Sequence, residues 1–282
     1  MKRVLITGAN SYVGTNVEKW LMKEPENFYI ETLDMRDPNW KNFDFSKFDV
    51  VFHVAGIAHI KENNHNKFLY YQINRDLAIE TAKIAKNSRV KQFIFMSTMA
   101  IYNENDECID SLSVPKPKSS YAISKFQAEK IIMDMCTQDF KVAILRPPLI
   151  YGSYSPGNYS KLSKFIKKYR VIIKYMNIKS FIYIDNLSYF TKNIIDREMK
   201  GIFHPHNSKN TSTYNICTII AKTHKKKVLI LSLPRFILIL LKTKSIKKIF
   251  GSHYYNFPQD RVEYIGLEES ILLSETVKGQ KL

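Results

Sequence analysis

Apolar residues in the first half of the chain alternate between short runs that suit strands and longer stretches with helical spacing. Five runs are rich in β-branched and aromatic residues and apolar on both faces, as buried parallel strands are: residues 4–7, 28–33, 50–54, 93–96 and 142–145. Apolar residues recur every three or four positions over residues 13–22, 69–86 and 121–135, which predicts helices there. This alternation predicts an α/β fold built on a doubly wound parallel sheet.

The pattern loosens in the second half of the chain. Residues 152–157 form a loop of Gly, Ser and Pro, and residues 161–169 suit a basic helix. We therefore expect one domain over residues 1–150 and a smaller lobe, mainly residues 151–282, over the carboxyl edge of the sheet, where open α/β sheets bind ligands. Whether segments near residues 181–204 return to the sheet stays open.

The net charge is concentrated in that second half. The 282 residues include 43 basic and 26 acidic ones, a formal charge of +17. Residues 1–150 hold 20 basic and 18 acidic residues, against 23 and 8 in residues 151–282, so we expect an anionic ligand to be bound there.

The basic residues near the C-terminal end allow two interpretations. Lys225–Lys227, the apolar residues 228–233 and the lysines of residues 235–250 suit a strand and a helix with solvated charges, or a peripheral contact with a membrane. We expect no nucleic-acid partner, because no recognised motif accompanies these charges.

Apolar run lengths and cysteine spacing indicate the compartment. No apolar run approaches the ~20 residues that cross a bilayer, and the chain starts with a basic pair that leads directly into a strand. The three cysteines, Cys108, Cys136 and Cys217, lack the spacings of zinc sites and disulfide frameworks. We expect a cytoplasmic protein with reduced thiols and no metal.

A short loop with glycines links the first strand to the first helix. It reads Thr7-Gly8-Ala9-Asn10-Ser11-Tyr12-Val13-Gly14, a context in which N–H groups at a helix N-terminus bind a pyrophosphate. Asp34 ends the second strand, where a carboxylate accepts hydrogen bonds from an adenine-ribose diol and repels a 2′-phosphate. We predict an NAD site. Arg36 leaves NADP open, since a guanidinium there can bind phosphate, stack on adenine or be solvated.

A second group of residues follows the fourth strand. Ser97 and Thr98 end that strand, and Tyr121 and Lys125 share one face of a later helix. A nearby ammonium and a cationic nicotinamide would both favour the phenolate of a tyrosine whose ordinary pKa is ~10. A Tyr-x-x-x-Lys pair alone is usually a solvated helix pair. After a dinucleotide loop and a Ser-Thr strand end, it predicts an acid–base pair, with the Thr98 hydroxyl on the reacting oxygen.

With these motifs the chain resembles the extended short-chain dehydrogenase/reductase family of nucleotide-sugar epimerases, dehydratases and ketoreductases. The resemblance runs from Thr7 to about Gly201 and includes Asp49–Gly56, Asn74, Phe95–Tyr102, Tyr121 and Lys125, Arg146–Gly152, and Phe181–Leu187. It implies a Rossmann-type NAD(P)-binding domain with a smaller C-terminal substrate-binding lobe. Homodimers are common in that family, and we expect one here.

The resemblance also implies roles for individual residues. Thr98, Tyr121 and Lys125 would be catalytic. The residues placed around the cofactor are Gly8, Ser11, Tyr12, Val13, Gly14, Asp34, Arg36, Ala55, Gly56, Asn74, Ser97, Lys125 and Pro148. Asn158 and Lys179 would contact the diphosphate of a nucleotide-linked substrate.

Three positions depart from the family pattern. Ser11 stands where a middle glycine is usual, which would reshape the pyrophosphate turn. Met99 and Ala100 replace the Asp-Glu pair of the 4,6-dehydratases, so no obvious acid is present for eliminating water. Lys179 replaces the more usual arginine and offers a point charge instead of a bidentate clamp.

We therefore expect NAD(P)-dependent oxidoreduction at C4 of a UDP-linked hexose. The resemblance to the bacterial surface-polysaccharide branch favours a UDP-4-keto-sugar reductase that makes polysaccharide precursors. A UDP-hexose 4-epimerase is the alternative, and it would use the same catalytic residues. A non-catalytic cofactor-binding regulator is a third alternative, which the presence of Tyr121 and Lys125 opposes.

Overall fold

The computed structural model describes residues 1–58, 63, 66–232 and 251–276. Its contacts divide the chain into two units that interleave along the sequence. The first unit comprises residues 1–101, 115–147 and 187–205, and the second comprises residues 102–114, 148–186 and 206–282. The chain therefore passes between the units five times, once close to residue 150, where the sequence predicts a boundary.

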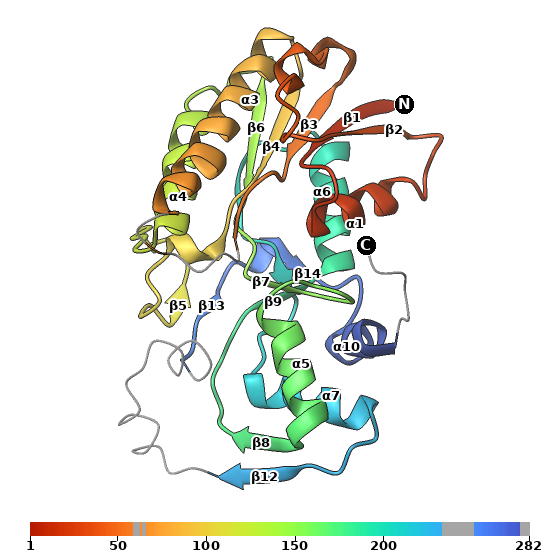
Figure 1. Ribbon diagram of the computed structural model, residues 1–282, viewed down its shortest axis with the longest axis vertical. Helices are drawn as coiled ribbons and strands as arrows, with labels where there is room; N and C mark the ends of the chain where they lie inside the picture. Colours follow the sequence, from red (N-terminus) through yellow and green to blue (C-terminus); the bar gives the residue numbers. More distant parts are fainter. Residues whose placement is uncertain (59–62, 64–65, 233–250, 277–282) are drawn as a thin grey trace. The chain divides into compact units, whose positions relative to one another are not determined.

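Six parallel strands form the sheet of the first unit, in the order β10-β6-β4-β3-β1-β2 (Figure 1). Their bounds are β1 Lys2–Thr7, β2 Phe28–Leu33, β3 Val50–His53, β4 Gln92–Met96, β6 Lys141–Leu145 and β10 Gly201–Phe203. β1 pairs with β2 on one side and with β3 on the other, so the order in which the chain adds strands to the sheet reverses next to β1, although the strands stay parallel. Open α/β sheets bind ligands outside the carboxyl ends of the strands at such a reversal.

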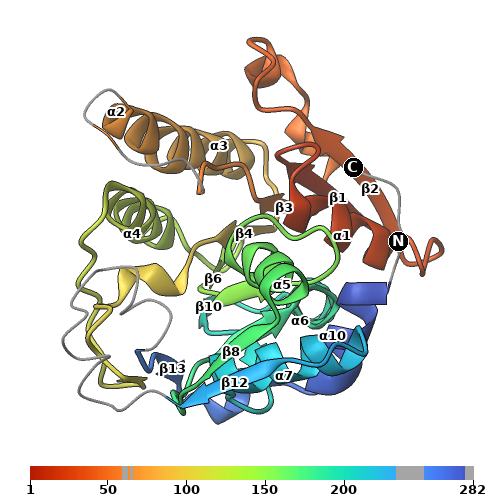
Figure 2. The ribbon, with the colours of Figure 1, turned by 60° about the horizontal axis from the view of Figure 1, so that its bottom comes forward.

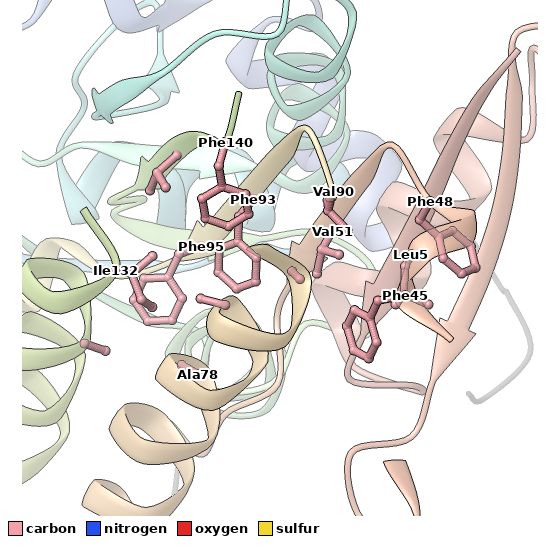
Figure 3. Close-up of a cluster of buried hydrophobic side chains, with 14 of the residues drawn as sticks. Leu5, Phe45, Phe48, Val51, Ala78, Val90, Phe93, Phe95, Ile132 and Phe140 are labelled. Carbon is pink, nitrogen blue, oxygen red and sulfur yellow. The ribbon is translucent and has the colours of Figure 1, made fainter. Parts of the chain in front are cut away.

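Side chains that alternate along the strands fill both faces of this sheet. Phe93 and Phe95 of β4 point to one face, where they pack with Ala78 and Ile132 of the covering helices (Figure 3). Ile94 lies between them in sequence and is also fully buried. β2 differs from the predicted buried strand, because it lies at the sheet edge and leaves Tyr29 exposed.

Helices cover the two faces of the sheet. α3 and α4 lie on one face, and α1 and α6 lie on the other (Figure 1). Their bounds are α1 Tyr12–Leu21, α3 Leu77–Asn87, α4 Ser120–Met133 and α6 Ile184–Asp196. The helix predicted over residues 69–86 is divided, because a π-helical segment, Tyr71–Asp76, joins α2 (Lys67–Tyr70) to α3. Such wide turns are frequent at functional sites, and this one contains the buried Asn74.

In the residues that the structure describes, the second unit contains short parallel strand pairs and the helices α5, α7 and α10. The pairs are β7 with β9, β8 with β12, β5 with β13 and β11 with β14. Their bounds are β5 Cys108–Ile109, β7 Leu149–Tyr151, β8 Val171–Lys174, β9 Phe181–Tyr183, β11 His206–Asn207, β12 Leu229–Ser232, β13 Tyr254–Tyr255 and β14 Arg261–Val262, and the helices are α5 Asn158–Tyr169, α7 Thr213–Thr223 and α10 Leu267–Thr276. β9 therefore does not join the main sheet, whereas residues 201–203 do as β10.

A buried carboxylate holds the helices of the second unit together. Glu275 of α10 accepts hydrogen bonds from Tyr159 and Ser163 of α5, at 3.0 and 2.8 Å, and lies 2.7 Å from His224 at the end of α7. The strand predicted over residues 228–233 is β12, and the helix predicted over residues 235–250 lies outside the described residues. Within the described part of the chain, no helix is long and apolar enough to span a membrane.

Candidate active site

The predicted cofactor loop lies where β1 and β3 end side by side. The Ala55 N–H donates to the Thr7 carbonyl at 2.9 Å, which draws the chain after β3 against the start of the loop. A Cβ added at Gly8 would lie 2.7 Å from the Ala55 nitrogen, and Gly8 has a φ of +113°. Only glycine meets both conditions without strain. Gly8 thus permits the close backbone approach that forms the loop.

Ser11 is the N-cap of α1. Its φ and ψ of −74° and 144° are ordinary extended values, and its hydroxyl accepts the Gly14 N–H at 3.1 Å. A glycine is therefore not required at this position, and the departure at Ser11 gives a capped helix. The N–H groups of the first turn, including that of Val13, have no acceptor within the helix and point beyond its end. This end of α1 fits a pyrophosphate.

Asp34 and Arg36 form an ion pair just after β2. The Arg36 Nε lies 3.0 Å and its Nη2 2.7 Å from the Asp34 carboxylate oxygens. The side-chain and backbone hydrogen bonds from Arg36 lower the pKa of Asp34 to about 2. Asp34 is thus a permanent anion at the place where a ribose diol is expected, and Arg36 is held beside it.

Lys125 lies buried at the carboxyl ends of β3 and β4. Its Nζ donates to the Met96 carbonyl at 2.7 Å and lies 4.6 Å from the centre of the Phe95 ring. A Cβ added at Gly56 would lie 3.3 Å from this Nζ and 2.9 Å from the Asn74 Oδ1, so both side chains lie beside Gly56. Burial lowers the pKa of Lys125 to about 7, against the opposing charge of Glu129.

Asn74 holds the segment that follows β3. Its Nδ2 donates to the Ile57 carbonyl at 3.0 Å, and its Oδ1 accepts the Ile57 N–H at 2.9 Å. Both ends of the amide are engaged by one residue of the loop. Asn74 therefore fixes the course of the loop beside Gly56, through a side chain that the π-helical segment places inward.

Tyr121 lies one helical turn before Lys125 and is half-buried. A side-chain hydrogen bond joins it to Thr98, and its ring meets Tyr70 edge-on at 6.2 Å. Burial raises the pKa of Tyr121, and the hydrogen bond with Thr98 only partly opposes this. The expected shift toward phenolate is therefore not present in the protein without ligands. The phenol is protonated at neutral pH and is a proton donor beside the Thr98 hydroxyl.

The structure shows a buried charge network next to Lys125 that the sequence analysis did not predict. Arg146 donates to the Glu129 carboxylate through Nε, at 3.2 Å, and through Nη2, at 2.7 Å. The Ser97 hydroxyl donates to the same carboxylate in a short hydrogen bond, so this predicted cofactor residue is turned toward Glu129. The signal in the sequence is spacing: Glu129 follows Lys125 by four residues and so shares its helix face.

His53, at the end of β3, is a core residue. It is fully buried, and its Nδ1 lies 2.8 Å from the Thr7 hydroxyl. Burial, assisted by the charge of Lys125, lowers the pKa of His53 to about 3. The imidazole is therefore neutral at physiological pH and joins the ends of β1 and β3.

The predicted substrate residues belong to the second unit, together with Pro148. Lys179 is anchored by backbone hydrogen bonds of 2.8 and 2.9 Å with Thr211. Burial lowers the pKa of Lys179 to about 8, and the charge of Glu104 opposes this shift. Asn158 is the first residue of α5 and is exposed. The other predicted site residues all lie in the first unit, close to the carboxyl ends of its strands.

The chain is similar to a known protein family and to several known proteins. The model of the NAD dependent epimerase/dehydratase family matches residues 4–188. The N-acetyl-alpha-D-glucosaminyl-diphospho-ditrans,octacis-undecaprenol 4-epimerase of Escherichia coli O157:H7 is 27% identical over 82% of this chain and 75% of its own length. The UDP-glucose 4-epimerase of Vibrio cholerae is 26% identical over 59% of this chain and 57% of its own length.

A solved structure gives the same fold over nearly the whole chain. The UDP-glucuronic acid 4-epimerase of Bacillus cereus, in complex with NAD, superimposes with a TM-score of 0.77 at 17% identity, over 97% of this chain and 95% of that one. The Rossmann-type fold predicted from the sequence is thereby confirmed.

Proposed function

The chain belongs to the NAD dependent epimerase/dehydratase family, and we propose that it oxidises and reduces C4 of a hexose carried on a diphosphate. One observation carries this proposal: the Tyr121 phenol is hydrogen-bonded to Thr98, with Lys125 one helical turn further along α4. The first reaction to test is 4-epimerisation, because two of the relatives that the chain is similar to are 4-epimerases by name. A 4-ketoreductase, which the sequence favours, uses the same groups and is the alternative.

The fit of NAD rests on the residues after β1 and β2. The start of α1 would bind the pyrophosphate, and the Asp34 carboxylate would accept the adenine-ribose hydroxyls. Lys125, whose Nζ lies beside Gly56, would hold the nicotinamide ribose. NAD held by these residues would supply the hydride acceptor and donor for C4.

Thr98 and Tyr121 would bind the oxygen on C4. When C4 is reduced, the protonated Tyr121 donates its proton to that oxygen, and its raised pKa keeps the proton available at neutral pH. When C4 is oxidised, Tyr121 takes the proton back, and this direction is favoured when Lys125 is charged. A 4,6-dehydration is not proposed, because Met99 and Ala100 supply no acid for the departure of water.

Two assays separate the proposed reactions. An epimerase converts UDP-glucose or UDP-N-acetylglucosamine to the 4-epimer with no net consumption of cofactor. A ketoreductase oxidises one NAD(P)H for each UDP-4-keto-6-deoxy-N-acetylhexosamine reduced. Undecaprenyl-diphosphate-linked N-acetylglucosamine should be tested beside the UDP-sugars, because the E. coli relative carries that carrier in its name.

Tyr121→Phe tests the residue assignment. The ring still packs against Tyr70, so folding and NAD binding should survive while turnover falls by ~10² or more, as expected for a positioned acid or base. Tyr169→Phe, which removes an exposed phenol of the second unit, should leave turnover unchanged. Turnover in Tyr121→Phe equal to wild type, on whichever substrate is active, would refute the assignment.

A further inference from the structure

Two segments of the second unit carry basic residues and no acidic ones. Residues 158–176, which contain α5 and β8, include six lysines or arginines, and residues 222–232, which contain β12, include four lysines. Neither segment contains Asp or Glu. β8 and β12 lie side by side as a parallel pair (Figure 2), so both sets of charges belong to one region of this unit.

Exposed apolar side chains lie among these charges. In β12, Leu229 is 60%, Ile230 45% and Leu231 39% exposed. Leu229 and Leu231 pair with Val171 and Ile173 of β8, and paired residues of parallel strands point to the same face. The strand pair thus presents an aliphatic face to solvent, next to Lys225–Lys227 at its start.

The end of α5 adds an aromatic pair to the same region. Phe165 is 47% and Tyr169 56% exposed, and their ring centres are 4.9 Å apart. Tyr169 precedes β8 by a single residue, Arg170, and the Lys168 Nζ lies 5.1 Å from the Tyr169 ring. Exposed aromatic rings beside lysines are typical of residues at a membrane interface.

Most of these basic residues form no ion pair with an acidic residue in the described part of the chain. Lys167 lies 3.1 Å from Glu275 of α10. Among the described residues, no ion pair is formed by the other nine, which are Lys161, Lys164, Lys168, Arg170, Lys174, Lys222, Lys225, Lys226 and Lys227. Their charge is therefore not neutralised by ion pairs within the described unit, and it can attract an anionic surface.

We propose that β8, β12 and the end of α5 dock on the surface of an anionic lipid bilayer. Lysines would lie over the lipid phosphates, and Leu229, Leu231, Phe165 and Tyr169 would enter the headgroup region. A lipid surface fits better than a nucleic acid, because the aliphatic face would gain nothing from a hydrophilic polyanion. It also fits better than a second copy of this chain, whose matching surface would carry the same positive charge. The proposal is independent of the reaction at C4.

Vesicle sedimentation with the full-length protein tests this surface. At ~0.15 M salt, the protein should bind phosphatidylcholine vesicles that contain phosphatidylglycerol at least tenfold more strongly than vesicles of phosphatidylcholine alone. Binding should weaken at 0.5 M salt, because added salt screens charge. Equal binding to both vesicles, or to neither, overturns the proposal.

Two variants separate charge from apolar contact. Lys225→Gln/Lys226→Gln/Lys227→Gln and, separately, Leu229→Ser/Leu231→Ser should each lower binding to anionic vesicles at least tenfold. The matched control, Lys19→Gln/Lys83→Gln/Lys130→Gln, removes three exposed lysines of the first unit and should bind like wild type. Thermal melting shows whether each variant is folded, and Leu229→Ala replaces the double variant if that one is not.

Other partners give different results. Loss of binding in the control equal to that in the Lys225–Lys227 variant would indicate unspecific attraction by net charge. If the Leu229/Leu231 variant binds vesicles as strongly as wild type, the apolar side chains do not contribute, and the surface is a site for polyanions in general. Failure to bind vesicles, with a dimer that dissociates in the Leu229/Leu231 variant, would assign the surface to a second copy. Each of these outcomes overturns the proposal.

Discussion

Burial sets the protonation states of the groups around the end of β4. It lowers the pKa of Lys125 to about 7 and raises the pKa of Tyr121, so both groups favour their neutral forms. Glu129 opposes the shift of Lys125, although its carboxylate is also bound by Arg146 and Ser97. The charge on Lys125 therefore depends on the hydrogen bonds that Arg146 and Ser97 make to the Glu129 carboxylate. Glu129 itself is not among the residues expected to touch ligands.

At the residue scale, Asp34→Ala should change the cofactor preference. The change removes the acceptor for the ribose diol and also frees Arg36 from its ion pair, so that its guanidinium can bind a 2′-phosphate. We expect NADH binding to weaken about tenfold or more, with NADPH binding weakened less or improved. Fluorescence titration of both cofactors measures this. Equal losses for the two would contradict the ribose-diol role.

A second prediction at this scale concerns Lys179 and pH. Its pKa of about 8 means that the ammonium is charged below that pH and loses its proton as the pH rises through it. If Lys179 binds the substrate diphosphate, UDP affinity should fall about tenfold between pH 7 and pH 9. At pH 9, Lys179 is charged in only about one protein molecule in ten. Lys179→Arg should remove this pH dependence, because a guanidinium stays protonated. Calorimetric titration with UDP is the measurement, and an unchanged pH profile in Lys179→Arg would exclude Lys179.

At the scale of elements, substitutions at two glycines distinguish the cost of backbone strain from the cost of preventing a close backbone approach. Gly8 and Gly201 both have a positive φ, +113° and +121°, but an added Cβ meets the Ala55 backbone at Gly8 and nothing within 4 Å at Gly201. Gly201→Ala should therefore cost about 1–3 kcal/mol of unfolding free energy, from strain alone. Gly8→Ala should cost more and should also weaken NAD binding, because the end of β1 must move from β3. Urea unfolding measures both, and equal costs would show that the approach to Ala55 does not limit the loop.

The sequence predicts the positions of strands whose two faces are both buried and of helices whose apolar residues recur with a regular period. Phe93, Ile94 and Phe95 are all buried, and a run of this kind predicts β4 directly. The π-helical segment is not predictable, since one extra residue per turn around Asn74 leaves the apolar spacing of residues 69–86 almost unchanged. The exposure of Tyr29 follows from the position of β2 at the sheet edge, which the strand order decides and local pattern does not.

The candidate site can be proposed from the sequence only in part. Gly8, Tyr121 and Lys125 carry spacings that the proposed chemistry requires, so the sequence is sufficient to propose them as site residues. Glu129 is a charged residue within a helix, and only its burial against Arg146 distinguishes it from a solvated surface charge. The pKa direction of Tyr121 also depends on burial and could not be obtained from its spacing to Lys125.

At the scale of the whole molecule, the sheet of the first unit is completed by a distant segment. Residues 187–205 supply β10, which pairs with β6, and two carbonyl acceptors for the buried Gln92 amide, from Ile194 and Met199 at 3.0 and 2.9 Å. The Lys2 Nζ also donates to the Ile195 carbonyl at 2.7 Å. Without this segment, the β6 edge and the part of one face that α6 covers would be exposed, and the Gln92 amide would lose both acceptors.

The last prediction follows from that dependence on residues 187–205. A fragment of residues 1–150 contains the whole cofactor loop, Asp34, Tyr121 and Lys125, yet it should fail to fold stably, because unpaired buried polar groups and exposed apolar strands are each costly. A fragment of residues 1–205 contains β10 and the Gln92 acceptors, so it should regain a cooperative melting transition. NAD should raise the melting temperature of this fragment, because a ligand that binds the folded state stabilises it. Thermal melting of both fragments and of the full chain, with and without NAD, measures this. NAD affinity in the 1–150 fragment equal to that of the full chain would show that the cofactor site does not need the returning segment.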